Sequence, residues 1–176
     1  MTQIIADSSS LILLAKCGLI ETVCKLFDVI VPLAVVLEAA PENLVKKYPD
    51  SAAISELISR GAITVENTGS DELPLPISIH KGEKEALILA IRFKGAVLAT
   101  DDGKAIKAAR FLKVPFIITP KIVTELFRLH IISFQKARSS IEMLGKIGRY
   151  SPDILADALG LMMEEKDGQT DNHKNT

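Results

Sequence analysis

Acidic residues stand where apolar segments of this chain end, and their positions are the strongest chemical signal in the sequence. Asp7 follows the apolar run 4–6, and the pair Asp101 and Asp102 follows the apolar run 96–100. A carboxylate at the end of a buried segment is unfavourable unless it is paired or bound to a cation. Several such carboxylates repel one another, and hard oxygen ligands prefer Mg²⁺ or Mn²⁺ to zinc. We therefore expect a site for a divalent cation.

Three glutamates join this candidate set because they lie beside apolar helical segments. Glu38 closes the segment 32–37, whose first residue is a proline suited to the first turn of a helix. Glu83 and Glu85 open the apolar segment 86–90. The competing interpretation makes Glu38 a solvated helix residue and the other two first-turn charges that favour the helix dipole.

Helix capping is the competing interpretation for the aspartates. Asp7 is followed by three serines, a sequence typical of a helix start. Asp101 or Asp102 could cap the helical segment that follows, while the other one binds metal. The residues alone leave open which of these two is the ligand, and they leave the same choice open between Glu83 and Glu85.

Positive charge is concentrated directly after the second acidic pair. Residues 1–102 carry nine Lys or Arg and 14 Asp or Glu, whereas residues 103–149 carry ten and two. Lys104, Lys107 and Arg110 are the first cations of this basic block. A metal site beside such a block suits a polyanion such as nucleic acid. The alternative is that these cations lie on solvated helix faces or contact a partner protein.

Short apolar segments alternate with helical patterns, and this alternation predicts the scaffold that positions the acids. The segments with the length and composition of buried strands are 4–6, 29–31, 62–65, 96–99 and 115–119. They predict an α/β fold, a three-layer α/β/α sandwich around a central, mainly parallel, twisted sheet of about five strands. Ligands of such sheets bind at the carboxyl ends of the strands, which is where Asp7 and Asp102 fall.

The length and composition predict one domain with a substantial core. The chain has 176 residues, of which 48% are hydrophobic, and no linker or internal repeat divides it. From Pro120 to about Met163 the pattern is helical, with breaks at 130–133 and 145–151. We predict a single domain over residues 1–163 and a polar tail over residues 164–176, for which the composition predicts disorder.

The sequence also bears on location. Its apolar stretches are far shorter than the roughly 18–20 residues of a membrane span, and no basic signal region precedes the first apolar run. Cys17 and Cys24 do not make a disulfide framework, and their spacing of seven suits one buried helix face. We expect a reduced, cytoplasmic protein with no membrane partner.

Motifs of other chemistries are missing from the sequence. There is no Gly-x-Gly-x-x-Gly run and no P-loop, and the three histidines have no zinc-ligand spacing. The serines at 8–10 have no plausible histidine partner, and Ser9 stands where a phosphoaspartyl transferase would carry its second aspartate.

Four stretches, taken in order, resemble the acidic motifs of PIN-domain nucleases. They are Ile-Ile-Ala-Asp-Ser-Ser at 4–9, Val-Pro-Leu-Ala-Val-Val-Leu-Glu at 31–38, Gly-Glu-Lys-Glu-Ala-Leu-Ile-Leu-Ala at 82–90 and Leu-Ala-Thr-Asp-Asp at 98–102. The similarity covers residues 3–160, and the last two stretches resemble a subgroup of uncharacterised, toxin-like prokaryotic proteins.

The resemblance implies a ribonuclease that depends on Mg²⁺ or Mn²⁺. Many PIN proteins are VapC-like toxins of toxin–antitoxin pairs, so the resemblance also implies an RNA substrate, a small antitoxin protein as partner and a homodimer. The segments 11–14 and 35–37 are candidates for the dimer seam.

Matched residue by residue, the resemblance implies four catalytic acids that also hold the metal: Asp7, Glu38, Glu85 and Asp102. Glu-Ala-Leu-Ile mirrors the family's Asp-Ala-Leu-Ile pattern, and Thr-Asp-Asp mirrors its Thr-x-Asp pattern. Ser9 and Thr100 match supporting hydroxyl residues. The third acid is Glu where the family has Asp, so Glu83 competes for that role, and Asp101 competes for the fourth.

The chemistry of such a set is phosphodiester hydrolysis. A bound divalent ion would lower the pKa of a water molecule and stabilise charge on the attacked phosphate. Asp7 and Asp102 would bind the ion directly, Glu38 and Glu85 would bind it or hold its waters, and the first lysines of the basic block would neutralise neighbouring phosphates. The alternatives are a catalytically weak PIN-fold module that binds RNA or protein and, less well supported, a metal-dependent phosphatase.

Overall fold

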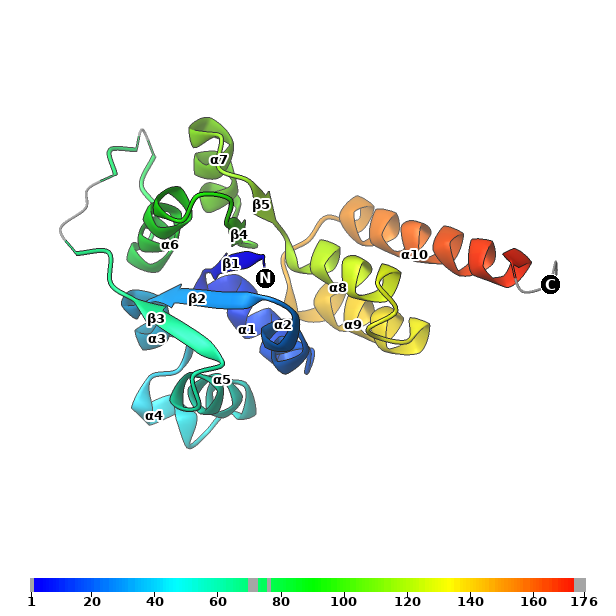
Figure 1. Ribbon diagram of the computed structural model, residues 1–176, viewed down its shortest axis with the longest axis horizontal. Helices are drawn as coiled ribbons and strands as arrows, with labels where there is room; N and C mark the ends of the chain where they lie inside the picture. Colours follow the sequence, from blue (N-terminus) through cyan, green and yellow to red (C-terminus); the bar gives the residue numbers. More distant parts are fainter. Residues whose placement is uncertain (1, 70–72, 76, 173–176) are drawn as a thin grey trace. The chain divides into compact units, whose positions relative to one another are not determined.

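A five-stranded parallel sheet is the framework of the protein in its computed structural model, which describes residues 2–69, 73–75 and 77–172 (Figure 1). The strands are β1 (Gln3–Ala6), β2 (Asp28–Pro32), β3 (Ile63–Glu66), β4 (Val97–Ala99) and β5 (Phe116–Ile117). Every neighbouring pair is parallel. The predicted α/β class and parallel sheet are confirmed.

The order of the strands creates a topological switch point at the centre of the sheet. Across the sheet the order is β3-β2-β1-β4-β5. The chain therefore runs from β1 to one side and then returns to place β4 on the other side of β1. In parallel sheets, ligands bind at such a switch point, outside the carboxyl ends of the two strands.

Seven helices accompany the sheet in the described part of the first compact unit, residues 1–118. They are α1 (Ser8–Lys16), α2 (Ile20–Leu26), α3 (Leu33–Ala39), α4 (Glu42–Val45), α5 (Pro49–Ser59), α6 (Lys81–Arg92) and α7 (Gly103–Leu112). Figure 1 shows α6 and α7 grouped on the side of β4 and β5, away from α1, α2 and α5.

The core explains why α6 and α7 cover one face of the sheet. Ile5 pairs in register with Ile30 on one side and with Leu98 on the other, so these three side chains point to the same face. They pack in one buried cluster with residues of α6 and α7. Ile4 and Val29, which alternate with them, are also buried. Apolar packing on both faces gives the predicted three-layer arrangement.

The segment 42–60 is divided between two helices, α4 and α5. Pro49 is the reason, because a proline inside a helix removes a hydrogen bond and clashes with the preceding turn, whereas it suits a first helical position. The hydroxyl of Ser51 then donates to the carbonyl of Ala39 at 2.9 Å, which fixes α5 to the end of α3.

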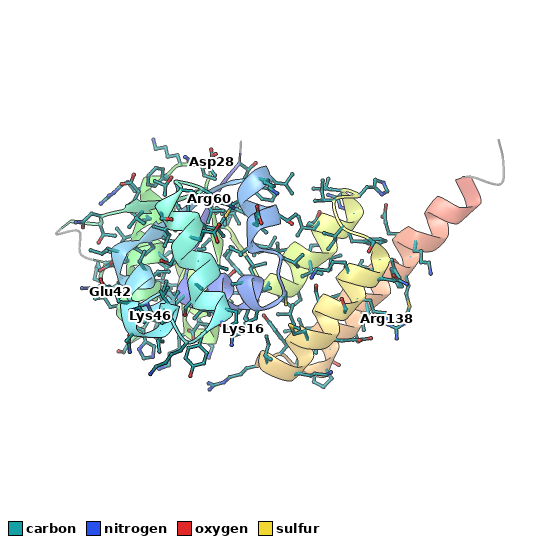
Figure 2. The ribbon with its side chains drawn as sticks, turned by 90° about the horizontal axis from the view of Figure 1, so that it is seen from below. Lys16, Asp28, Glu42, Lys46, Arg60 and Arg138 are labelled. Carbon is teal, nitrogen blue, oxygen red and sulfur yellow. The ribbon has the colours of Figure 1, made fainter. Side chains whose placement is uncertain are left out.

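Exposed ion pairs lie on the outside of the first unit. Figure 2 shows Lys16 at the end of α1 and Arg60 after α5. The Lys16 ammonium lies 3.5 Å from Asp50, and the Arg60 guanidinium lies 3.1 Å from Glu21. Surface pairs in which the cation is exposed contribute roughly 0–1 kcal/mol each, so the apolar core is the main source of stability.

The second compact unit, residues 119–176, is helical. Its helices are α8 (Thr119–Arg128), α9 (Phe134–Ile147) and α10 (Pro152–Asn172), and each contacts the other two. The rings of Phe127 and Phe134 meet edge to face with centroids 5.8 Å apart. None of the helices in the described ranges has the length and hydropathy that crossing a bilayer requires.

Helix α10 continues to Asn172 and so includes much of the segment 164–176 for which the composition predicted a disordered tail. Residues 173–176 lie outside the described part of the chain. The breaks between the three helices fall where the sequence predicted them. The single domain over residues 1–163 stays a prediction, because the structure defines two compact units that are described separately.

Candidate active site

Asp7 lies at the carboxyl end of the central strand and is almost completely buried, with 1% of its surface exposed. Its Oδ1 accepts hydrogen bonds from the hydroxyl of Ser9 at 2.7 Å and from the backbone N–H of Ser10 at 3.0 Å. Its Oδ2 accepts a hydrogen bond from the hydroxyl of Thr100. Asp7 therefore caps α1, as the competing interpretation held, and is at the same time bound to the neighbouring strand.

Strand register brings these residues together. Ala6 pairs with Ala99, so the residues that follow leave β1 and β4 at the same edge of the sheet. The backbone N–H of Asp7 donates to the carbonyl of Ala99 at 3.0 Å. The backbone N–H of Asp101 donates to the hydroxyl of Ser9 at 3.0 Å. Ser9 and Thr100, the two expected supporting residues, thus fix the position of Asp7.

The environment of Asp7 disfavours its charged form. Burial, with a smaller contribution from the nearby negative charge of Asp101, raises the pKa of Asp7 from 3.8 to about 7. Hydrogen bonds from Ser10, Thr100 and Ser9 oppose this effect without cancelling it. A cation beside this carboxylate would favour the charged form.

Asp102 combines a capping role with one available oxygen. Its Oδ1 accepts hydrogen bonds from the backbone N–H groups of Lys104 at 2.8 Å and Ala105 at 2.9 Å, which makes Asp102 the N-cap of α7. Within the described ranges no residue donates a hydrogen bond to its Oδ2. Capping therefore does not exhaust the acceptor capacity of this carboxylate.

Glu83 lies close to two other acids. It is buried, with 8% of its surface exposed, and its Oε2 accepts a hydrogen bond from the backbone N–H of His80 at 2.7 Å in a capping box at the start of α6. Burial raises the pKa of Glu83, and the negative charges of Asp102 and Glu38 raise it further, although the hydrogen bond from His80 opposes them. Glu83 is therefore near enough to both Asp102 and Glu38 for their negative charges to repel its own.

Glu38 is held by two residues that the sequence did not single out. The hydroxyl of Ser8 donates to Glu38 Oε2 at 2.7 Å, and the backbone N–H of Gly82 donates to Oε1 at 3.3 Å. Ser8 follows Asp7 directly, and Gly82 belongs to the first turn of α6. The glycine in the Gly-Glu-x-Glu run was the available signal, because a glycine inside a helix calls for a packing reason.

Glu85 lies in different surroundings from Glu83. Its Oε2 accepts a long hydrogen bond, 3.4 Å, from the backbone N–H of Ala34 in the first turn of α3. Its Oε1 lies 3.7 Å from the ammonium of Lys81. The resemblance assigned Glu85 to the third acidic position, whereas the charges that act on Glu83 come from Asp102 and Glu38.

The three expected nucleic-acid contacts are exposed side chains of α7. Lys104 and Lys107 lie one turn apart on the helix that Asp102 caps. The Arg110 guanidinium lies 5.5 Å from the centre of the Phe116 ring, so part of its surface packs on that ring. No acidic residue occurs between positions 103 and 124, and the exposed side of α7 is therefore positively charged.

The donors gathered at this edge are carboxylate oxygens, the type that Mg²⁺ and Mn²⁺ prefer. Among the residues described, no three His, Cys, Asp or Glu side chains converge as a preformed metal site would require. The chemistry of the set still fits a hard cation, because the charges of Asp102 and Glu38 repel that of Glu83 and Asp102 Oδ2 has no hydrogen-bond donor in the described ranges. In this structure the carboxylates are arranged by hydrogen bonds to the protein.

A protein-family model matches most of the chain. The family model DUF3368, described as a PIN domain, matches residues 3–164. All of the acids discussed above lie inside the matched range. No curated protein matches the chain.

Proposed function

This chain belongs to the PIN-domain family, whose members are generally nucleases, and from that premise we propose that it is a Mg²⁺- or Mn²⁺-dependent endoribonuclease. The observation that carries the proposal is the buried carboxylate of Asp7 at the switch point of the sheet. Its pKa of about 7 and its hydrogen bond from Thr100, the residue after β4, suit a ligand that becomes fully charged when a cation binds.

The positions of Asp7 and Asp102 suggest different roles for them in binding the metal. Asp7 is the fixed ligand, because Ser9 and Thr100 leave its carboxylate no freedom to turn. Asp102 offers its Oδ2 from the start of α7 while Oδ1 holds the helix cap. When bound, a divalent ion would supply an activated water and stabilise charge on the attacked phosphate.

Two glutamates complete the proposed set. Glu38 and Glu83 lie close enough for their charges to interact, and Glu83 also lies within range of the charge of Asp102. We place Glu83 in the third acidic position and keep Glu85 as the alternative given by the family pattern. Lys104 and Lys107 would neutralise phosphates that flank the cleaved bond, because both project from the helix that begins at Asp102.

A toxin role in the cytoplasm, with a small antitoxin protein as partner, is the finer proposal, and it comes from the family resemblance. Exposed apolar side chains on α3 support a protein partner or a second copy of the chain: Leu33 is 49% and Leu37 is 65% exposed. Of the candidate seam residues in the segments 11–14 and 35–37, Leu11, Leu14 and Val35 are buried within the first unit and so are not available to a second copy.

A cleavage assay tests the proposal directly. The purified chain is incubated with a mixed RNA in Mn²⁺ and in EDTA, beside an Asp7→Asn variant. We expect cleavage by the parent protein in Mn²⁺ alone and none by the variant. Metal-dependent cleavage that persists unchanged in Asp7→Asn would contradict the site assignment.

A binding module is the second candidate, and one observation favours it: the described acidic side chains do not converge on a common point. Such a module would shift labelled RNA in a gel without cutting it in any divalent metal. Retained binding in Asp7→Asn, together with no cleavage by the parent, would favour the module over the nuclease.

A further inference from the structure

We propose that Gly82 is a positioning residue: its missing side chain provides the space in which the carboxylate of Glu38 lies. The inference deepens the proposed function and rests on it, because Glu38 belongs to the proposed metal-binding set. It concerns a residue that neither the acidic pattern nor the helix caps require.

The carboxylate of Glu38 occupies the space that a side chain at position 82 would need. A Cβ atom built on Gly82 would lie 2.7 Å from Oε2, 2.8 Å from Oε1 and 3.0 Å from Cδ of Glu38. All three distances are shorter than carbon atoms of real side chains normally allow. Any residue other than glycine would therefore push the carboxylate away.

The backbone at Gly82 gives no other reason for a glycine. The residue lies in the first turn of α6, in a helix where glycine is among the least favourable residues. Gly61, Gly69 and Gly95, by contrast, have φ angles between 67° and 87°, which side chains rarely adopt. The space taken by the Glu38 carboxylate, rather than the backbone angle, therefore accounts for a glycine at this position.

The space beside Gly82 that holds the Glu38 carboxylate, called the seat below, fixes the direction of that side chain. The Gly82 N–H donates to Oε1 at 3.3 Å, while the Ser8 hydroxyl donates to Oε2 at 2.7 Å, so each oxygen has one donor. The first turn of a helix also carries partial positive charge, which favours a carboxylate there. Because Ser8 follows Asp7 and Gly82 precedes Glu83, the seat joins Glu38 to both neighbours in the acidic set.

Alanine at position 82 should change the site without unfolding the protein. The atoms that a methyl group would meet belong to the far end of a flexible side chain, and Glu38 is exposed enough to turn into solvent. The expected consequence is a displaced carboxylate and a weaker metal site.

The test is a double-mutant cycle read by the binding of Mn²⁺ alone in a titration calorimeter. The proteins are the parent chain, Gly82→Ala, Glu38→Ala and the double variant. We expect each single change to weaken Mn²⁺ binding at least about tenfold, and the double variant to bind no more weakly than Glu38→Ala. Losses that multiply in the double variant, or full affinity in Gly82→Ala, would overturn the proposal.

Gly103→Ala is the matched control. Gly103 is the first residue of α7, and a Cβ there would meet no atom within 4 Å. We expect its Mn²⁺ affinity to stay within about twofold of the parent value, since no carboxylate lies in the way. A loss in Gly103→Ala as large as that in Gly82→Ala would assign the effect to the added methyl group in general and overturn the seat.

Crystal structures of the metal-free parent chain and Gly82→Ala separate this inference from the proposed function. A parent protein that binds no Mn²⁺ and cuts no RNA would reject the metal-dependent nuclease. The seat would still be supported if Glu38 left hydrogen-bonding distance of residue 82 in the variant alone. It would be overturned if the carboxylate kept its place beside the new methyl group.

Discussion

The hydroxyl of Thr100 donates a hydrogen bond to the buried Oδ2 of Asp7, and so joins the ends of two neighbouring strands across 93 positions of sequence. Thr100 is fully buried and Asp7 nearly so. The same hydroxyl oxygen accepts the backbone N–H of Asp102 at 3.3 Å. Thr100 therefore links the acid at the end of β1 to the acid that caps α7.

Removing this hydroxyl should destabilise the protein. Thr100→Val keeps the shape of the side chain but takes one donor from a buried carboxylate, which costs about 1–3 kcal/mol of unfolding free energy. The loss should be larger at pH 8 than at pH 5, because the hydrogen bond favours the charged form of Asp7. Urea unfolding of the parent and Thr100→Val at both pH values measures this loss of unfolding free energy.

Thr124→Val is the control for that experiment. Thr124 is also buried, and its hydroxyl donates to the carbonyl of Pro120 at 3.0 Å, which carries no titratable charge. The loss of unfolding free energy in Thr124→Val should be the same at pH 5 and pH 8. An equal pH dependence in the two variants would show that Thr100 does not act on the charge of Asp7.

The stability of the metal-free protein should fall as pH rises through the range that Asp7 titrates. The pKa of Asp7 is about 7 in the folded chain against an ordinary value of 3.8, so the folded state binds the proton more tightly than the unfolded state. This contribution is fully present below about pH 4 and is lost as pH approaches and passes 7. Asp7→Asn should flatten the dependence and be the more stable protein at pH 8.

Added Mn²⁺ should reverse that trend. The ion competes with the proton on Asp7, so the rise in melting temperature caused by Mn²⁺ should grow between pH 5 and pH 8. Differential scanning fluorimetry of the parent and Asp7→Asn measures the increment. An increment that is equal at both pH values in the parent would remove Asp7 from the set of ligands.

Two substitutions of Asp102 separate its cap from its proposed metal contact. Asparagine can still accept the N–H groups of Lys104 and Ala105, so Asp102→Asn should stay within about 0.5 kcal/mol of the parent, whereas Asp102→Ala should lose about 0.5–2 kcal/mol. Both should lose Mn²⁺ binding. If Asp102→Asn kept full affinity and cleavage, the residue would be a cap and nothing more.

Glu83→Gln and Glu85→Gln decide the third acidic position. The negative charges of Asp102 and Glu38 act on Glu83, while Glu85 lies near Lys81 and the start of α3. We expect Glu83→Gln to weaken Mn²⁺ binding at least about tenfold and Glu85→Gln to weaken it less. The opposite order, measured by calorimetry, would restore the assignment implied by the family pattern.

The charge on α7 should appear in the salt dependence of RNA binding. Changing Lys104 and Lys107 together to glutamine in the Asp7→Asn background should lower the slope of log K against log salt by about 1–2 units. Lys94→Gln is the control, because Lys94 is exposed and precedes β4, at the opposite edge of the sheet. An equal change in slope from the control would deny a specific role to α7.

The sequence by itself determined the sheet and the place of the aspartates. Alternating apolar strands and helices can bury their faces only in a layered parallel sheet, and parallel strands end at a common edge. Asp7 and the residues from Thr100 to Asp102 were therefore predictable neighbours. The position of the basic block was predictable for the same reason, because the helix that follows a strand begins at the edge where that strand ends.

Only the tertiary structure places Glu83 within range of the charge of Asp102 and Glu85 beside the backbone of Ala34. Side chains two positions apart on a helix are rotated by roughly 200° about its axis, so Glu83 and Glu85 point in different directions. The packing of α6 determines which of them lies near Asp102. The sequence pattern carries no information about that rotation. The contact between Gly82 and Glu38 depends on the same packing, because it joins the ends of two helices that are 44 residues apart in the chain.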